Sequence, residues 1–310
     1  MQSRLSNMNT RDLSYFRILV EKRNYTEVAE MFSVSQPTIT QAVKRLEKEF
    51  DSKLVHVDRV HQKTEITRSG YLLYEKSKVI QKNIDLARKE IKASDSEKIK
   101  FGLPPIIGTL YFPQVVQKLA QESLFQKLQI SESGSSELLN ELDNGNVDIA
   151  VIATIKPIQN PKYEVEYLGS RPFSVIVSAK NPLSKSTKPV DFRDLMAERF
   201  IRLTGKYIHS QMLEDYCKYY EIEPEVVYDT PDISWFKSLI RANVGIGILV
   251  RDEVGEYDRD LVCLDIANPL PESFNISVVR RKSYILKPDE QKLVDILQRM
   301  NIKNTNGGYY

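Results

Sequence analysis

Hydrophobic residues recur every three or four positions in several stretches of the first fifty residues, which is the spacing of one face of an α-helix. The first helix is predicted over about residues 10–22, with a buried face of Leu13, Phe16, Leu19 and Val20. A second helix is predicted to begin at Thr26, whose hydroxyl is suited to capping a helix N-terminus, with Ala29 and Phe32 on its inner side.

The segment "SVS" interrupts this pattern, and a third helix is predicted to follow it with Ser35 as its N-cap. Pro37 falls in the first turn, where its missing backbone N–H leaves no hydrogen bond unmade. The expected buried face repeats at steps of four, three and four residues: Ile39, Val43, Leu46 and Phe50. Two helices joined by such a short turn are typical of a helix-turn-helix.

The other face of the third helix is polar in a way that packing does not require. Gln can pair with adenine, Thr can contact a base edge or a thymine methyl group, and Lys and Arg can contact phosphate or guanine. A solvated outer face would have the same composition, and helix-turn-helix spacing alone does not separate these two interpretations. The residues on this face are Gln36, Thr38, Thr40, Gln41, Lys44 and Arg45.

Two short alternating segments, "KLVHV" and "KTEIT", predict strands joined by a turn at "DRVHQ". Such a hairpin would carry Arg59, His61 and Lys63 near its tip, beside the third helix, where they could contact the DNA backbone or minor groove. "TRSG" is then expected to cap another helix.

This fourth helix is predicted from Thr67 to about Ala93, with a heptad-like seam that Ser77 interrupts. The seam is narrow and the other faces carry Lys, Glu, Gln and Asn, which suits a two-helix coil better than a helix lying on its own domain. Either arrangement fits the spacing alone. The apolar seam residues are Leu73, Ile80, Ile84, Ala87 and Ile91.

The larger C-terminal region alternates predicted strands and helices. "KIKFGLPPIIGTLYFPQVVQKLAQE" and "LQISESGSSELLNELDNGNVDIAVIAT" each contain an apolar strand, a Pro-, Gly- or Ser-rich turn and a helix. Further strands are expected in "FIRL", "EVVYD", "VGIGILV" and "ISVVRR". Alternation of this kind implies a parallel sheet with helices on its faces, and therefore an α/β fold.

Composition limits the classes of protein and of partner. The chain has 310 residues, 41% hydrophobic and 28% charged, which is enough for two or three domains with real cores. No run of 18 apolar residues and no secretory signal is evident, and the two cysteines, Cys217 and Cys263, favour a cytoplasmic protein. Residues 1–66 hold 11 basic and 9 acidic residues, so DNA binding must depend on where the charges lie and not on their sum.

Catalytic and metal chemistry is not expected. The three histidines, His56, His61 and His209, do not combine with cysteine at metal-ligand spacing. No phosphate-binding loop, nucleophile elbow or dinucleotide fingerprint is present. We therefore expect neither an enzyme nor a bound cofactor, and packing roles are favoured over redox roles for Cys217 and Cys263.

Taken together, these motifs resemble the winged helix-turn-helix of LysR-type transcriptional regulators. The resemblance rests on Phe16, the "SQP" of 35–37, "LE" at 46–47, Arg59 and the "T-x-x-G" of 67–70. It continues through "LLNELDNGNVDIAVI", "SAKNPL" and "LIRANVGIGILV", and so covers roughly 8–300. The chain departs from the family where Asp51 and Asn243 replace a usual Gly.

The resemblance implies three parts: a DNA-binding domain over 1–66, a linker and dimerisation helix over 67–93, and an effector-binding domain over 94–302. The last would consist of two Rossmann-like subdomains joined by crossing strands, as in periplasmic solute-binding proteins. Subdomain I would span about 98–168 and 269–302, and subdomain II about 169–268, followed by a disordered tail at 303–310.

The same resemblance implies the site residues and the partners. A small anion such as a carboxylate would bind where strands end and helices begin, near Pro105, Ile106, Ser133, Ser135, Thr204 and Gly205. The expected partners are double-stranded promoter DNA, a small-molecule effector, further copies in a dimer or tetramer, and RNA polymerase, without a membrane. The residues expected to face DNA are Ser35, Gln36, Pro37, Thr38, Thr40, Gln41, Lys44 and Arg59.

Three classes of function are compatible with parts of the sequence. A transcription regulator, expected to be an activator, is favoured over a ligand-binding protein of the solute-binding fold without a DNA role, and over an enzyme. A weaker similarity to activators of malolactic fermentation genes suggests an organic acid, and malate in particular, as the effector.

Overall fold

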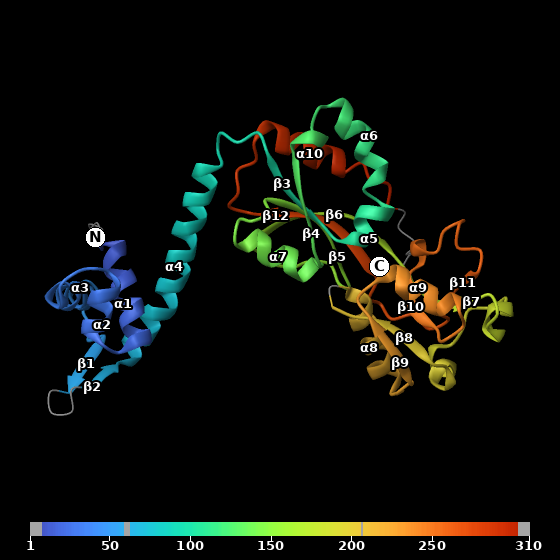
Figure 1. The fold of residues 1–310 in the computed structure, drawn as a ribbon, viewed down its shortest axis with the longest axis horizontal. Helices are drawn as coiled ribbons and strands as arrows, with labels where there is room; N and C mark the ends of the chain where they lie inside the picture. Colours follow the sequence, from blue (N-terminus) through green and yellow to red (C-terminus); the bar gives the residue numbers. More distant parts are fainter. Residues whose placement is uncertain (1–7, 59–62, 206, 303–310) are drawn as a thin grey trace. The chain divides into compact units, whose positions relative to one another are not determined.

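The computed structural model describes residues 8–58, 63–205 and 207–302, and the chain divides into one unit that ends at Ser94 and another that begins at Asp95 (Figure 1). The predicted tail at 303–310 lies outside the described residues. Within the described ranges, no helix is both long and apolar enough to cross a membrane.

The N-terminal unit is a three-helix core followed by a hairpin and a long helix (Figure 1). The predicted first, third and fourth helices and both strands of the hairpin are confirmed. The hairpin strands pair in antiparallel register from Val55 opposite Ile66 to Asp58 opposite Lys63. The elements are α1 (Thr10–Lys22), α2 (Tyr25–Met31), α3 (Gln36–Glu49), β1 (Val55–Asp58), β2 (Lys63–Ile66) and α4 (Arg68–Lys92).

The helix starts differ in detail from the prediction. Asn24, and not Thr26, caps α2: its Oδ1 accepts hydrogen bonds from the backbone N–H groups of Thr26 and Glu27 at 2.9 and 3.2 Å. Ser35 is the N-cap residue of α3 but makes no side-chain bond to the helix backbone. Asn is preferred over Thr as an N-cap residue, and here its side-chain oxygen accepts from two N–H groups of the first turn.

The apolar side of α3 is buried as predicted at Ile39, Val43 and Leu46, each at most 4% exposed. Phe50 is a correction, because its side chain is 46% exposed. The helix ends at Glu49, and Phe50 has φ −94° and ψ 3°, so it leaves the helical face before it can join the core.

The "T-x-x-G" motif has a clear physical basis at the start of α4. The Thr67 hydroxyl accepts a hydrogen bond from the Gly70 N–H at 2.9 Å and donates one to the Lys53 carbonyl at 2.7 Å. A Cβ atom at Gly70 would lie 2.3 Å from the Leu54 carbonyl oxygen. Only glycine therefore allows the start of α4 to pack this closely on Leu54, the residue before β1.

Asp51 and Asn243 occupy turns that require left-handed backbone, with φ 43° and 59°. Asp and Asn tolerate this conformation better than other non-glycine residues, because their short polar side chains can bond locally. The two departures from the family pattern are therefore compatible with an unchanged chain path.

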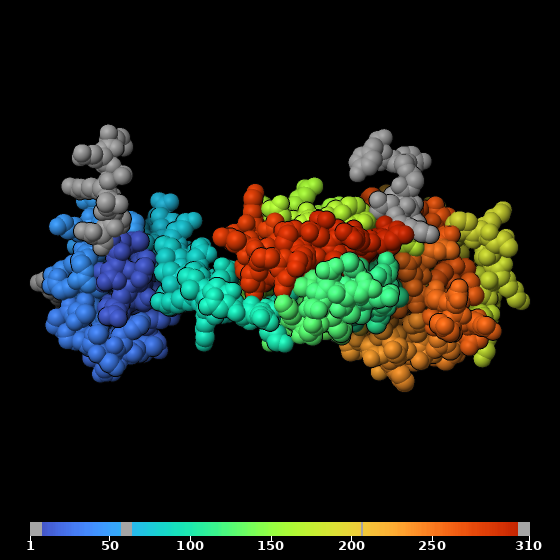
Figure 2. All heavy atoms as spheres, turned by 90° about the horizontal axis from the view of Figure 1, so that it is seen from above, coloured from blue at the N-terminus to red at the C-terminus, as the bar shows by residue number. Residues whose placement is uncertain are grey.

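The C-terminal unit has two lobes. In the first, α5 (Pro105–Leu110), α6 (Pro113–Gln121) and α10 (Pro288–Leu297) cover one face of a five-stranded sheet, and α7 (Ser135–Asp143) covers the other (Figure 1). Figure 2 shows α6 and α10 side by side on the surface. The strands, in sheet order, are β4 (Leu128–Glu132), β3 (Ile99–Leu103), β5 (Ile149–Thr154), β12 (Phe274–Arg281) and β6 (Tyr163–Arg171).

This sheet is mixed, which corrects the prediction of a parallel one. Strands β3, β4 and β5 are parallel, whereas β12 is antiparallel to both β5 and β6. The physical reason is that β6 leads out of this lobe and β12 leads back into it, so both run along the sheet as crossings and not as βαβ repeats.

The second lobe combines a three-stranded antiparallel sheet, in the order β10-β7-β11, with a parallel pair, β8 and β9. A single bridge between Phe200 and Ile246 connects the two groups of strands. The elements are β7 (Phe173–Ser178), β8 (Phe200–Leu203), α8 (Ile208–Tyr220), β9 (Val226–Thr230), α9 (Ile233–Arg241), β10 (Gly247–Val250) and β11 (Leu261–Leu264). Short 3-10 turns lie at Phe125–Lys127, Pro182–Lys185, Phe192–Ala197 and Arg251–Glu253.

Arg45 was predicted to face outward for DNA, but its guanidinium is bound by Asp12 of α1. The Nε and one terminal nitrogen of Arg45 donate to the two carboxylate oxygens at 2.8 and 2.7 Å. Asp12 is 3% exposed, so this pair clamps α3 to α1 next to their apolar contact.

We predict that Arg45→Ala destabilises the N-terminal unit by about 1–2 kcal/mol, because it leaves the buried Asp12 carboxylate without its cation while the Arg45 side chain itself is partly solvent-screened. Calorimetry of the full chain would show this as a lower midpoint for the transition of that unit. Lys22→Ala, which breaks an exposed pair with Glu27, is the matched control and should change the midpoint little. Equal effects of both substitutions would contradict the clamp.

Candidate functional site

The outward face of α3 carries most of the predicted DNA-facing residues. Ser35, Gln36, Pro37, Gln41 and Lys44 are exposed, and Thr38 and Thr40 are half-buried. Because Ile39, Val43 and Leu46 occupy the opposite side, these polar side chains face away from the core of the unit. The predicted row is therefore a single accessible surface.

Hydrogen bonds within this surface orient several of its side chains. The hydroxyls of Ser35 and Thr38 are 2.9 Å apart, and Gln36 donates from Nε2 to the Thr40 hydroxyl at 3.0 Å. Among the residues described, Gln41 and Lys44 have no hydrogen-bond partner. Gln41 can therefore present both its amide donor and its acceptor to a base edge without first breaking a bond.

A hollow of about 440 Å³ adjoins the C-terminal part of α3 and carries three lysines, Lys44, Lys48 and Lys53. Glu47 lies in the same hollow, but its carboxylate is occupied by Lys53 at 2.9 Å and by the Leu54 N–H at 3.0 Å. Burial opposes ionisation of Glu47, but these bonds outweigh it and lower the pKa of Glu47. The negative charge of Glu47 is thus paired with Lys53, which leaves Lys44 and Lys48 as the cationic groups available at this hollow.

The wing prediction is tested only in part. Strands β1 and β2 form the predicted hairpin, but Arg59 and His61 lie outside the described residues. The assignment of Arg59 to the DNA contact therefore stays a prediction.

The predicted seam of α4 divides into two parts. Leu73 is 8% exposed and Ile80 is half-buried, and both pack on the core of their own unit. Farther along the helix Ile84 is half-buried, Ala87 is exposed and Ile91 is 74% exposed. Ser77 stabilises the first part by donating from its buried hydroxyl to the Tyr74 carbonyl at 2.7 Å.

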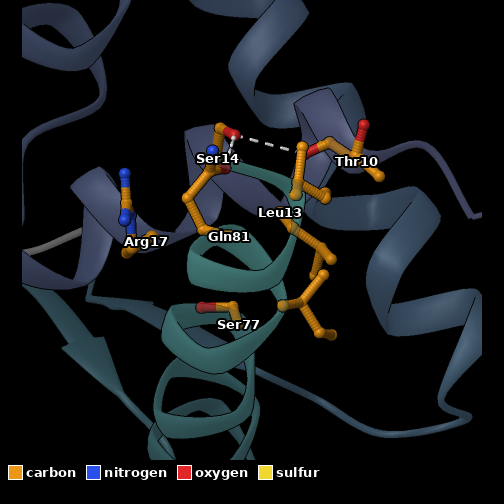
Figure 3. Close-up of a pocket in the computed structure, with 8 residues that line it drawn as sticks. Thr10, Leu13, Ser14, Arg17, Ser77 and Gln81 are labelled. Atoms are coloured by element: carbon orange, nitrogen blue, oxygen red, sulfur yellow. Dashed lines mark hydrogen bonds between the residues drawn. The ribbon is translucent and has the colours of Figure 1, made fainter. Parts of the chain in front are cut away.

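Figure 3 shows where α1 and the first part of α4 meet. Thr10, Leu13, Ser14 and Arg17 face Ser77 and Gln81 across a shallow groove, and the Ser14 hydroxyl bonds the Gln81 amide oxygen at 3.3 Å. This polar contact orients the beginning of the long helix on the DNA-binding unit.

A second apolar stripe on α4 was missed. Leu72 and Val79 are 59% and 57% exposed, and Leu86 is half-buried. They are seven residues apart and so share one face of the helix. The sequence does not single them out, because the neighbouring row 73-80-87 has the same period.

The six effector candidates lie at strand ends in both lobes. In the first lobe, Pro105 and Ile106 begin α5 after β3, while Ser133 and Ser135 follow β4. The parallel register pairs Leu103 with Glu132, so these two turns share one edge of the sheet. In the second lobe, Thr204 and Gly205 follow β8, and Gly205 has φ 72°.

The candidates differ in how free their side chains are. Ser135 is 4% exposed and its hydroxyl accepts a hydrogen bond from the Ala153 N–H at 3.0 Å, while Ile106 is 3% exposed. Ser133 is near Glu141, with 3.5 Å between Oγ and the carboxylate. Ser135 and Ile106 therefore contribute to the packing of the first lobe. Thr204 is half-buried, so its hydroxyl is more accessible than that of Ser135.

Sequence reasoning missed His209, which lies in the first turn of α8 and is 2% exposed. Its Nε2 accepts a hydrogen bond from the Val250 N–H at 3.2 Å, and its ring packs against Phe173 and Phe274, which begin the strands after each crossing. Burial lowers the pKa of His209 to about 3. The imidazole is therefore neutral, and because Nε2 accepts, the proton is on Nδ1.

The lobes are also tied by Asp252, in the turn after β10. Its carboxylate accepts from the Tyr111 hydroxyl of the first lobe at 2.9 Å and from the Arg171 guanidinium on the crossing strand, with the Nε bond at 2.6 Å. These residues are far apart in sequence, so no local pattern could have predicted the group.

Neither cysteine has the surroundings of a reactive thiol. Burial raises the pKa of Cys217, and it raises the pKa of Cys263 to about 11. A thiolate is the nucleophile in peroxide chemistry, so both thiols are poorly suited to it. Among the described residues, no group of three or more His, Cys, Asp or Glu side chains could hold a metal.

Comparison with known proteins matches this arrangement part by part. Residues 10–71 match the family described as "Bacterial regulatory helix-turn-helix protein, lysR family", and residues 92–301 match "LysR substrate binding domain". The chain belongs to the LysR family of transcription regulators. It is 32% identical, over 94% of its length and 99% of the relative's, to the "Malolactic fermentation system transcriptional activator" of Lactococcus lactis.

Other relatives and solved structures agree on the family fold. The "DNA-binding transcriptional dual regulator OxyR" of Escherichia coli is 24% identical over 94% of this chain and 95% of its own. The structure of HinK, a LysR family regulator of Pseudomonas aeruginosa, superimposes with TM-score 0.55 and 20% identity over 94% of this chain and 98% of its own. LysR-type proteins bind promoter DNA and small-molecule effectors and are not enzymes, so the expectations of a DNA-binding regulator and of a non-enzyme are confirmed.

For this LysR-type chain, Gln41→Ala is predicted to lower the preference for its operator over unrelated DNA by about 1–3 kcal/mol, because a base-edge contact is lost. Lys44→Ala should weaken binding to all sequences and reduce the slope of log K against log salt by about one. Fluorescence anisotropy over a salt series measures both quantities. The assignment fails if Gln41→Ala weakens specific and unspecific binding equally.

A second prediction concerns Glu253, which is 7% exposed beside Lys237. Burial raises the pKa of Glu253 to about 7, so the folded state holds a proton that the unfolded state has already lost. Protonated Glu253 makes its full contribution to the free energy of unfolding at pH values below the pKa of this residue in the unfolded chain. That contribution is lost as the pH rises through about 7. Between pH 6.5 and 8, Glu253→Gln should therefore lose about 1 kcal/mol less stability than the unsubstituted protein.

Urea unfolding at the two pH values measures this difference. His209 also takes up protons on unfolding near pH 6.5, but it does so in both proteins, so its contribution cancels in the difference between them. Identical pH dependence of the two proteins would contradict the assignment.

Proposed function

We propose that this protein is a dimeric transcriptional activator that reads promoter DNA with α3 and responds to a small organic acid, with malate as the leading candidate. The observation that carries the DNA part is the single accessible row of Gln36, Thr40, Gln41 and Lys44 on a helix whose other side is buried. The organic acid is supported by the similarity to the malolactic fermentation activator.

The second lobe offers suitable chemistry for a carboxylate. Helix α8 has 13 residues and no side-chain cap, so the N–H groups of its first turn point toward the loop after Thr204. The Nδ1–H of His209 lies in the same turn, is buried and has no partner within the described structure. An acceptor atom bound there would remove a cost of about 1–3 kcal/mol for an unsatisfied buried donor.

A solved neighbour supports the same class of ligand. The effector binding domain of QuiR, determined in complex with shikimate, superimposes with TM-score 0.56 over 65% of this chain and 95% of its own, at 18% identity. The likeness concerns the fold, and it makes an organic acid a reasonable probe.

Dimerisation is proposed through α4, because one recognition helix in one groove gives weak binding and two linked copies give an avidity gain. Ile84, Ala87, Ile91 and the stripe formed by Leu72, Val79 and Leu86 are the available apolar surface. Leu73 and Ile80 have a smaller role in this proposal, since both already pack within their own unit.

We predict that Val79→Lys raises the dimer dissociation constant at least tenfold, because it places a charge in the apolar stripe. Lys92→Glu, an exposed change on another face of α4, is the matched control and should leave the dimer intact. Analytical ultracentrifugation measures the dissociation constant. An unchanged dimer in Val79→Lys would exclude the stripe from the interface.

The whole proposal is tested by anisotropy of labelled DNA from upstream of the chain's own gene, with scrambled DNA as competitor. L-malate, succinate and glycerol are added in turn. The expected result is sequence-specific binding that malate alters and glycerol does not. Thr204→Val should reduce the malate response at least tenfold and leave malate-free binding unchanged, whereas Thr187→Val on an exposed loop should change neither.

Two results would contradict different parts of this proposal. Binding without sequence preference at any salt concentration would overturn the regulator assignment for α3. Specific binding that no organic acid alters would overturn only the effector class.

A further inference from the structure

A cavity of about 610 Å³ lies where the chain returns from the second lobe to the first. Pockets that bind small molecules usually measure about 300–1,000 Å³, so this one is large enough for a metabolite. None of the six effector candidates lines it. Its walls are Ile155, Lys156, Pro157, Tyr167, Pro271, Glu272, Ser273 and Asn275.

The polar floor of the cavity is fixed by Asn275, which is 5% exposed. Its side-chain amide donates to the carbonyls of Thr154, Ile155 and Ser273 at 3.3, 3.1 and 3.0 Å. These three bonds define the orientation of the amide, and its oxygen accepts from the Tyr167 hydroxyl at 3.4 Å. The floor therefore presents preorganised polar atoms and not mobile ones.

An irregularity in the sheet lies directly beside Tyr167. The register of β6 against β12 shifts by one residue between Ser277, opposite Tyr167, and Ile276, opposite Gly169. Bulges of this kind re-aim side chains and are frequent beside functional sites. The Tyr167 side chain is 50% exposed and lines the cavity beside this bulge.

One positive and one negative group stand together at this cavity. The Lys156 ammonium is 3.0 Å from the Glu272 carboxylate, and their side chains are 71% and 15% exposed. An ion pair with one such exposed partner contributes about 0–1 kcal/mol, so a ligand can replace it at little cost. The exposed Lys156 side chain has room to turn toward a ligand carboxylate, whereas the Glu272 side chain is largely buried.

We propose that this cavity is a second effector site that binds a free amino acid, with the ligand ammonium on Glu272 and the ligand carboxylate on Lys156. Opposite charges a few ångströms apart match the two ends of a zwitterion. A dicarboxylate is disfavoured, because one of its charges would face the Glu272 carboxylate in a partly desolvated site.

The position of the cavity gives the ligand a means to act. Pro271, Glu272 and Ser273 belong to the segment that joins β11 of the second lobe to β12 of the first. That segment is anchored on α8, where Tyr216 accepts from the Leu270 N–H at 3.2 Å and Tyr220 donates to the Asn268 carbonyl at 2.7 Å. An amino acid that bridges Lys156 and Glu272 would hold this crossing to the first lobe.

The test is isothermal titration calorimetry of the full chain with each of the twenty L-amino acids. For the best of them, the matched amine without the carboxylate and the matched acid without the amine are titrated next. The expected result is saturable 1:1 binding per chain of one amino acid, with at least tenfold weaker binding of each half-ligand.

Variants locate the site. Lys156→Gln and Glu272→Gln should each weaken the amino acid at least tenfold, whereas Lys118→Gln, which breaks an exposed pair with Glu122 elsewhere in the same lobe, should not. Glu272→Lys should exchange the preference from the amino acid to succinate, a gain of binding that misfolding cannot produce. Melting curves identify any variant that does not fold.

Absence of binding by all twenty amino acids would overturn the proposal. So would binding that both glutamine variants retain, or binding that Thr204→Val abolishes, since the ligand would then occupy the cleft near α8. DNA binding does not depend on this site, so its failure would leave the regulator assignment intact.

Discussion

One packing constraint determines how this protein can meet DNA: helix α3 is buried on one side only. Ile39, Val43 and Leu46 fix the rotation of the helix about its axis, and the Arg45–Asp12 pair fixes it against α1. Because this rotation is fixed, the polar side chains of the helix lie on the side away from the core: Gln36, Thr40, Gln41 and Lys44. The polar row is therefore a consequence of the core, and the clamp removes from it the arginine that the sequence had placed there.

The C-terminal unit depends on a comparable constraint, the two crossings between its lobes. Arg171 stands at the outward crossing and is bonded to Asp252, which also accepts from Tyr111. Asp252 follows β10, whose last residue, Val250, donates to His209 in the first turn of α8. A chain of direct contacts thus joins the proposed carboxylate site to the crossing strands, and the cavity beside Glu272 adjoins the return crossing.

Local features of the fold could be predicted from the sequence because their causes are local. Apolar spacing gives α1, α3 and α4, the turn chemistry of Thr67 and Gly70 gives the start of α4, and alternation gives the hairpin. Two local predictions failed: Asn24, and not Thr26, caps α2, and the Phe50 side chain lies outside the core. Spacing alone decides neither which of two polar residues caps a helix nor at which residue a helix ends.

The site was predictable only where one element carries it. The row predicted to face DNA lies on a single helix, and the structure leaves it accessible, whereas Arg45 is bound to a partner 33 residues away. The effector turns could be placed by the rule that ligands bind beyond strand ends, but their side chains could not be ranked, since Ser135 is held by the Ala153 N–H from another strand. His209, Asp252 and the Lys156–Glu272 pair depend on long-range contacts and left no local signal.

The central claim, that the outward face of α3 lies in the major groove in two linked copies, is tested most directly by affinity cleavage. An iron chelate is attached to Thr40→Cys in a full chain whose Cys217 and Cys263 are replaced by Ser, with Glu223→Cys in the second lobe as the control. We predict cleavage of operator DNA at two clusters whose centres are separated by a whole number of helical turns, about 10 base pairs each. Cleavage from the control position alone, or a single cluster from Thr40→Cys, would contradict this account.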